Sequence, residues 1–447
     1  MITKPRMKQL KLYFLFFIIL SLPDIVFAKS TADTISGNLT LKDCISYALK
    51  NQPVLRQSEI DREINERDIR IGLAGWLPQI NSANSYDHYF KGTPVNGFVL
   101  PNGAAISDVS TVGVQASQVL YNNDVWLASK TANYSRLYYK QNETSSKINV
   151  VSDVSKAFFD VLLSQRQLDI IKEDIVRLQR SLKDAVSRYD AGVTDKIDSK
   201  QATIALNNEI ATRKQTEESI KAKLAYLKQI MGLNAGKSVS LVYDSTKYEQ
   251  EAVIDTNQQL NYQNRIEYQL LQTQKNLQNI NVDYYRWGFL PSISAVGAYN
   301  MNYLSDRFSN LYSNNYPNLY AGVTLNIPIF TGTKRLQNVA KARLQVQRTD
   351  LDIENTQNTI STEYTQALAS YKSNYITWRT LKDNVQLAGD VYKVVSLQYR
   401  EGIKVYLDVI VAQSDLRTAE LNYYNALFQL LSSKIDLEKA LGNINVQ

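Results

Sequence analysis

An internal duplication constrains this chain more than any other feature, because the second half of its 447 residues repeats the first. Residues 75–78 (GWLP) return as 288–291 (GFLP), and residues 188–192 (RYDAG) return as 398–402 (QYREG). Matches that keep their order at a nearly constant offset of about 210 residues indicate two copies of one structural unit. The predicted organisation is a signal peptide (1–28), a first repeat (29–232), a polar inter-repeat segment (233–257), a second repeat (258–442) and a tail (443–447).

Each repeat contains a very long proline-free segment, which predicts α-helices over residues 123–189 and 333–400. Apolar residues alternately four and three apart form a heptad seam, typical of a helix packed lengthwise against another. In the second copy the seam is Ile360, Tyr364, Ala367, Tyr371, Asn374, Trp378, Leu381, Val385, Ala388, Tyr392, Val395 and Tyr399. A looser version in the first copy is Val151, Val154, Phe158, Val161, Leu168, Ile175, Leu178, Leu182 and Tyr189. Each helix would be about 100 Å long, which predicts a rod or tunnel with returning helices over 195–231 and 406–441.

Four segments of about eleven residues have the length and alternation of membrane strands, namely 79–90, 110–120, 292–303 and 319–329. Val323, Leu325, Ile327 and Ile329, for example, alternate with polar residues. Residues 91–109 and 304–318 are rich in Gly, Asn, Ser and Pro and are predicted to be surface loops.

Four strands cannot close a membrane barrel, since the smallest such barrels have eight. An open edge in lipid would leave backbone groups unpaired at several kcal/mol each. The barrel must therefore be shared between chains. Two chains would give a filled eight-stranded barrel, and three would give twelve strands and space for a lumen.

The first 28 residues are predicted to be a cleaved signal peptide. A basic start precedes the apolar stretch of residues 12–22, and Val26-Phe27-Ala28 offers small residues at the cleavage site. Cleavage removes four basic residues and Asp24, so the formal charge falls from +7 to +4. Such a mild excess makes no case for a nucleic-acid partner. No later apolar run reaches the eighteen residues of a transmembrane helix.

The inventory of reactive side chains argues against an enzyme. With one cysteine, Cys44, and one histidine, His88, the chain can form neither an internal disulfide nor a Cys/His metal cluster. Cys44 lies in an apolar helical pattern and is expected to be a buried thiol, and His88 is expected to be an ordinary strand residue. We therefore expect no catalytic residues, no metal and no cofactor.

Two further motifs are residues 39–53 (LTLKDCISYALKNQP) and residues 399–413 (YREGIKVYLDVIVAQ). The first resembles the opening motif of mature proteins of the TolC family of outer-membrane efflux and secretion channels, and the second resembles the family's helix-turn-helix tip. The resemblance extends over about 39–442. Two departures are that Lys29, not a lipid-bearing cysteine, is expected at the mature start, and that Val411 replaces a second acidic residue of the tip.

The resemblance implies an α+β membrane protein. Three chains of four strands would complete a twelve-stranded outer-membrane β-barrel, continued by a long periplasmic α-helical barrel with a mixed equatorial domain. The implied partners are two further copies of the chain, outer-membrane lipid, a periplasmic adaptor (membrane fusion) protein and an inner-membrane pump. That pump could be of the resistance-nodulation-division, ABC or major facilitator type. The implied function is a passive exit duct of a tripartite efflux pump or type I secretion system. The resemblance does not distinguish whether the cargo is drugs, metal ions, peptides or proteins.

The turns at 190–196 and 400–406 are predicted to dock the adaptor, through Gly192, Val193, Gly402 and Ile403. Glycine suits the left-handed conformation that ends a helix and reverses the chain. A plain hairpin turn without a partner is the alternative.

A periplasmic gate is predicted beside these turns. Three copies of Asp408 around one axis would form an acidic ring that favours cations, and the family places an aspartate at the matching position. Asp198, its counterpart in the first copy, could accept a hydrogen bond from Tyr399 or pair with Lys404 to hold the tips shut. The alternative is that both aspartates only complement helix dipoles.

The competing functional hypothesis is a secreted coiled-coil structural or adhesive protein, which explains the heptads but neither the alternating segments nor the duplication.

Overall fold

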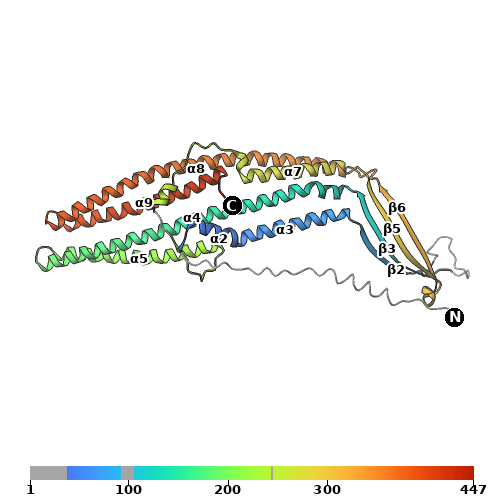
Figure 1. Cartoon of the computed structure of the whole chain (residues 1–447), viewed down its shortest axis with the longest axis horizontal. Helices are drawn as coiled ribbons and strands as arrows, with labels where there is room; N and C mark the ends of the chain where they lie inside the picture. Colours follow the sequence, from blue (N-terminus) through green and yellow to red (C-terminus); the bar gives the residue numbers. More distant parts are fainter. Residues whose placement is uncertain (1–37, 92–104, 243–244, 447) are drawn as a thin grey trace. The chain divides into compact units, whose positions relative to one another are not determined.

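The computed structural model describes residues 38–91, 105–242 and 245–446, which belong to the compact unit Asn38–Gln447 (Figure 1). The predicted signal peptide lies outside the described residues. The helices are α2 (Leu41–Asn51), α3 (Pro53–Leu73), α4 (Asn123–Asp190), α5 (Lys196–Met231), α6 (Ser245–Glu251), α7 (Ile266–Trp287), α8 (Lys334–Arg400) and α9 (Tyr406–Leu441). The strands are β1 (Asn38–Leu39), β2 (Gln79–His88), β3 (Asp108–Tyr121), β4 (Ser240–Leu241), β5 (Ser292–Ser305) and β6 (Asn315–Asn326). Short 3-10 helices are η2 (Ala74–Trp76), η3 (Tyr262–Asn264) and η4 (Phe308–Ser313).

The same series of elements occurs twice. The series α3, β2, β3, α4, α5 is followed by α7, β5, β6, α8, α9. Within this unit the four long strands lie at one end of the helices, and the turns that join α4 to α5 and α8 to α9 lie at the other (Figure 1). The turns and the strands are therefore separated by the full length of α4 and α8, which contain 68 and 67 residues.

The four long strands form one antiparallel sheet in the order β2-β3-β5-β6. The central pair joins the two repeats, with Val114 opposite Tyr299. The outer edges of β2 and β6 have no neighbour among the described residues, which is the condition that requires further chains to close a barrel. His88 lies at the end of β2 with its Nδ1 2.8 Å from Oδ1 of Asp108, in β3.

The predicted end of the last strand is wrong. The strand was expected over 319–329, but β6 spans Asn315–Asn326, so Ile327 and Ile329 lie beyond it. Pro328, two residues after the end of β6, has no N–H to donate to a ladder. The predicted loop 304–318 is also too long, because β5 continues to Ser305 and η4 makes the connection. The other long strands deviate less from 79–90, 110–120 and 292–303, by two residues at most at either end.

The predicted seam of α8 is covered along its whole length. Its twelve positions are all buried or half-buried, with Ile360, Tyr371 and Trp378 at most 8% exposed. The first-copy seam of α4 is likewise buried or half-buried except at its last member, because Tyr189 is 41% exposed where the helix ends. Apolar burial along each seam therefore joins every long helix to its neighbours and forms two hairpins, α4–α5 and α8–α9.

Both returning helices end at a glycine that touches the start of their own repeat. Gly232 and Gly442 have φ of 71° and 74°. A Cβ at Gly232 would lie 2.6 Å from the carbonyl oxygen of Asn51, and one at Gly442 would lie 2.6 Å from that of Asn264. Only glycine suits both the left-handed conformation and this close approach of two backbones.

The inter-repeat segment returns to the beginning of the described chain. Its strand β4 pairs in parallel with β1, with Asn38 opposite Ser240 and Leu39 opposite Leu241. Nearby, α2 buries Cys44 completely, and burial raises the pKa of its thiol to about 12. The expectation of a buried thiol is therefore confirmed.

None of the helices in residues 38–91, 105–242 and 245–446 is both long and apolar enough to cross a membrane.

Candidate gate at the hairpin tips

The two hairpin turns have the same backbone geometry. In the first, the N–H groups of Gly192 and Val193 donate to the carbonyls of Tyr189 and Arg188, both at 2.9 Å. In the second, the N–H groups of Gly402 and Ile403 donate to the carbonyls of the equivalent residues, Tyr399 and Gln398, at 3.1 and 2.9 Å. The glycines have φ of 71° and 79°. These bonds satisfy the last carbonyls of α4 and α8 and reverse the chain.

Apolar side chains surround both turns and face solvent. Val193 is 66% exposed and Ile403 is 71% exposed, although each follows its turn glycine directly. Val405, Leu407 and Val411 are each more than half exposed on the second hairpin. A Cβ at Gly192 or Gly402 would meet no described atom within 4 Å. The turns thus offer apolar surface that their own chain does not cover.

Asp408 lies in the first turn of α9 and is partly exposed. Its Oδ2 is 3.6 Å from Nζ of Lys404, four residues earlier, and the side chains are 39% and 45% exposed. An exposed pair at this spacing contributes about 0.3–0.5 kcal/mol. The carboxylate is therefore available to a partner or an ion at little cost.

Lys404 pairs with Asp408 and not with Asp198, contrary to one of the two predicted links. A pair only four residues apart in sequence requires less ordering than a pair between hairpins. The other predicted link is also absent from the described part of the chain, because the Tyr399 hydroxyl is buried without a hydrogen-bond partner. Burial raises the pKa of Tyr399, and the nearby Asp198 carboxylate also acts to raise it. Among the described residues, Asp198 therefore makes no hydrogen bond to Tyr399.

A small cluster joins the tips of the two hairpins. Tyr406 is 1% exposed, and its ring centre is 5.7 Å from that of Tyr399. Both pack with Ala202 of α5 and Val409 of α9, and burial raises the pKa of Tyr406 to about 12.

Arg188 completes this cluster from α4. Its guanidinium lies 4.5 Å from the centre of the Tyr399 ring, and its Nη2 donates a 2.8 Å hydrogen bond to the carbonyl of Arg400. Sequence reasoning missed Arg188 and Tyr406 as functional candidates. The duplication contained a signal for the first, because Arg188 stands where the second copy has Gln398, so the two tips are not equivalent.

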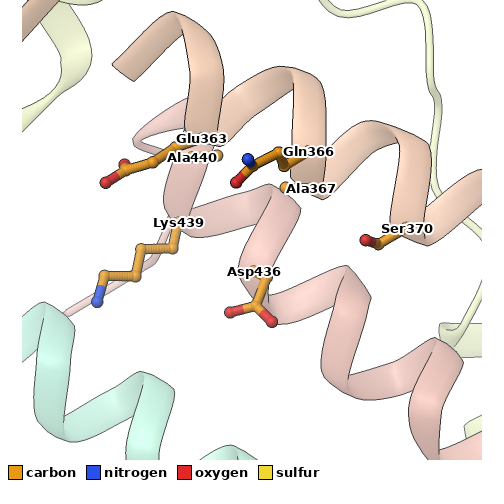
Figure 2. Close-up of a pocket in the computed structure, with 7 residues that line it drawn as sticks. All are labelled: Glu363, Gln366, Ala367, Ser370, Asp436, Lys439 and Ala440. Carbon is orange, nitrogen blue, oxygen red and sulfur yellow. The ribbon is translucent and has the colours of Figure 1, made fainter. Parts of the chain in front are cut away.

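A pocket elsewhere shows why the tips are the better candidate. Glu363, Gln366, Ala367 and Ser370 of α8 face Asp436, Lys439 and Ala440 of α9 around a cavity of about 350 Å³ (Figure 2). Its charged groups already have partners: Glu363 accepts from Arg265 at 2.7 Å, Asp436 binds Lys156, and Lys439 donates to Asn149 at 2.8 Å. The described residues also contain no group of three or more side chains arranged to hold a metal ion.

A four-stranded sheet with unpaired edges, joined to two long helical hairpins, defines one subunit of an oligomeric membrane channel. A family model described as outer membrane efflux protein matches residues 44–233 and 263–443, most of each repeat. The chain therefore belongs to the outer membrane efflux protein family.

Relatives and solved structures agree with this membership. The chain is 22% identical over 431 residues to outer membrane protein TolC of Vibrio cholerae, covering 94% of this chain and 95% of that protein. It is 22% identical over 412 residues to the probable efflux pump outer membrane protein TtgC of Pseudomonas putida, covering 90% and 82%. The crystal structure of CusC has a TM-score of 0.75 at 19% identity, covering 92% and 95%.

The predicted fold class, outer-membrane location and channel function are thereby confirmed. The chain is one subunit of an outer-membrane efflux channel, in which three copies of the four-stranded sheet complete a β-barrel and the hairpins form a periplasmic helical barrel. The proteins that it matches are channels, which argues against a coiled-coil adhesin.

Proposed function

We propose that the chain forms the passive exit duct of a tripartite export machine, and that the hairpin tips close its periplasmic mouth at rest. The observation that carries the gate is the joint between Arg188, Tyr399 and Tyr406. It ties the α4–α5 hairpin to the α8–α9 hairpin where both turn. A gate at this end separates the periplasm from the lumen, and the chain needs no chemistry of its own.

The turns are the proposed docking point of a periplasmic adaptor. Val193 and Ile403 expose apolar surface in equivalent positions, beside glycines with open space around them. An adaptor that covers these side chains gains apolar burial, and it can also displace the weak Lys404–Asp408 pair. Docking and opening would then occur at the same residues.

Asp408 is the proposed selectivity residue of the mouth. Three chains bring three copies of this partly exposed carboxylate to the same level of the helical barrel, and a ring of acids attracts cations and repels anions. The competing interpretation, that Asp408 only complements the dipole of α9, predicts no effect on ion selectivity.

The energy source and the choice of cargo are proposed to lie in the partners. An inner-membrane pump of the resistance-nodulation-division, ABC or major facilitator type would load the duct through the adaptor. With an ABC pump the same duct would serve type I secretion. Replacing the pump gene while keeping this chain should therefore change the cargo.

Ion conductance through a planar bilayer tests the gate. The full-length trimer should show a low resting conductance with a preference for cations, and Asp408→Ala should weaken that preference. Arg188→Ala, which removes the contact between the two hairpins at the tips, should raise the resting conductance. Unchanged selectivity and conductance in all these variants would leave only the helix-dipole interpretation.

A further inference from the structure

A buried charged cluster lies between the two hairpins, away from the tips. We call it the inter-hairpin network, and it consists of Asp174 and Arg177 of α4, Glu209 of α5, and Gln413, Arg417 and Glu420 of α9. Asp174, Glu209 and Gln413 are each at most 3% exposed. Charged side chains are rarely buried so deeply unless they are paired, so this position needs an explanation.

Asp174 is the centre of the network. Its Oδ1 accepts hydrogen bonds from Nε2 of Gln413 at 2.7 Å and from Nε of Arg177 at 3.2 Å. Its Oδ2 lies 4.0 Å from Nη1 of Arg417, which also donates to Glu209. One chain of contacts thus runs from α4 through α9 to α5 and joins the two hairpins.

The network is only partly satisfied. It contains three carboxylates and two guanidiniums, and Nη2 of Arg177 lies 3.6 Å from Oε2 of Glu420. Both of these atoms are buried without a hydrogen-bond partner, and so is Nε of Arg417. Buried ion pairs often add little stability compared with apolar packing, yet they discriminate strongly between alternative positions of the helices that carry them.

Comparison of the two repeats shows that the network occurs at the α4–α9 joint and has no counterpart at the equivalent positions of the other repeat. The positions 210 residues away hold Asn384, Leu387, Ala419, Thr203, Asn207 and Ile210, none of them charged. Apolar packing on a repeated heptad pattern is compatible with several registers, because a shift by one heptad recreates similar contacts. A buried charged cluster that occurs once removes this ambiguity at the α4–α9 joint.

Other polar contacts between α4 and α9 lie further from the turns. Asn149 meets Lys439, Lys156 meets Asp436, and Gln167 meets Asn425 at 3.1 Å. The Asp174–Gln413 hydrogen bond lies nearer to the tips than these three contacts. From Asp174 to the end of α4 the helix rises about 24 Å, at 1.5 Å per residue. A small displacement at the network would therefore be carried along rigid helices to the tips.

We propose that Asp174, Glu209, Gln413 and Arg417 are positioning residues that hold the α8–α9 hairpin in register against α4–α5 and thereby keep the tips closed at rest. This proposal rests on the gated channel proposed above. Sliding α9 along α4 would separate buried opposite charges before any new partner is reached, so the resting register is favoured over its neighbours. The tip cluster then closes on helices that are already aligned.

The test is the resting conductance of the full-length trimer in a planar bilayer, measured with Asp174→Asn. This variant keeps the shape of the side chain and removes the charge that Arg177 and Arg417 share. We expect a severalfold rise in resting conductance. Asp169→Asn is the matched control on the same helix, because Asp169 is 54% exposed and its nearest cations are 3.9 and 4.0 Å away. The control should conduct like the unmodified trimer.

A charge exchange separates positioning from simple loss of folding. Glu209→Arg and Arg417→Glu alone should each raise the resting conductance, and the two together should return it toward that of the unmodified channel. Gln413→Leu, a neutral change of similar size, serves if Asp174→Asn does not assemble. Loss of melting temperature without a rise in conductance would mean a structural role only and would overturn the proposal.

Arg188→Ala at the tips distinguishes failure of the network proposal from failure of the gate proposal. If Arg188→Ala raises the conductance but intact trimers of Asp174→Asn and Gln413→Leu do not, the network proposal is wrong and the gate stands. If the unmodified trimer and every variant conduct equally, the gate fails, and the network proposal fails with it.

Discussion

The guanidinium of Arg188 lies 4.5 Å from the centre of the Tyr399 ring, so a cation of the first hairpin rests on an aromatic face of the second. The same side chain donates to the carbonyl of Arg400, one residue further along. Because Tyr399 also packs on Tyr406, these contacts connect the last turn of α4 with both helices of the other hairpin.

Replacing Arg188 should therefore loosen the tips. A cation–π contact contributes about 0.5–1 kcal/mol at a partly exposed site, and three chains would lose it together. We expect Arg188→Ala to raise the resting bilayer conductance, and Arg188→Lys to raise it less, because lysine keeps the charge and loses the planar fork. Equal conductance of the alanine variant and the unmodified trimer would contradict the role of this joint.

Gly442 should be more sensitive to substitution than Gly402. Both have left-handed backbones, which cost about 1–2 kcal/mol for a residue with a Cβ. At Gly442 a Cβ would also lie 2.6 Å from the carbonyl oxygen of Asn264, and forcing such neighbours apart costs about 1–3 kcal/mol more. Melting of the purified trimer should show a larger loss for Gly442→Ala than for Gly402→Ala. Equal losses would mean that this contact relaxes freely.

The docking hypothesis predicts that bulk at the turn, and not backbone strain, blocks export. Gly402→Ala and Gly402→Trp share the unfavourable φ of 79°, and the first adds only a methyl group to open space. We expect Gly402→Trp to abolish export in cells and Gly402→Ala to retain most of it. The same comparison applies to Gly192. Trimer yield in the outer membrane is the control, and normal export by both tryptophan variants would reject docking at the turns.

Glu420 should contribute a pH dependence to stability. Burial raises the pKa of its carboxyl above the ordinary value, with Arg177 opposing the shift. A raised folded-state pKa means that the folded chain binds the proton more tightly than the unfolded chain. The stability from this group therefore grows as the pH falls through the folded-state pKa toward the unfolded value of about 4.3.

Glu420→Gln should remove this contribution. The difference in melting temperature between about pH 7 and pH 5 should shift relative to the unmodified trimer, which should gain more on acidification than the variant does. Glu218→Gln is a useful contrast, because hydrogen bonds from Lys214 and Lys221 lower the pKa of Glu218 to about 2. Identical pH profiles of Glu420→Gln and the unmodified protein would refute the effect of burial.

The sequence by itself determined the long helices and their hairpin turns. Heptad spacing, the absence of proline and a turn glycine are local signals, so α4 and α8 begin and end within one residue of the predicted 123–189 and 333–400. Because of the duplication, each element could be predicted from two copies of the same pattern. The predicted strand ends were less accurate. Pro328 ends β6 early, and β6 begins already at Asn315 because that residue pairs with β5, which the local sequence does not show.

Only the tertiary structure decided which side chains meet. The sequence placed Asp198, Tyr399 and Lys404 in one neighbourhood. However, Lys404 in the turn pairs with Asp408 four residues later, and the guanidinium of Arg188 lies over the Tyr399 ring. The inter-hairpin network was likewise invisible, since Asp174 and Gln413 are 239 residues apart and carry no motif. Local periodicity specifies a helix and its apolar face, whereas polar contacts between distant segments depend on the rotation and register that apolar packing sets throughout the unit.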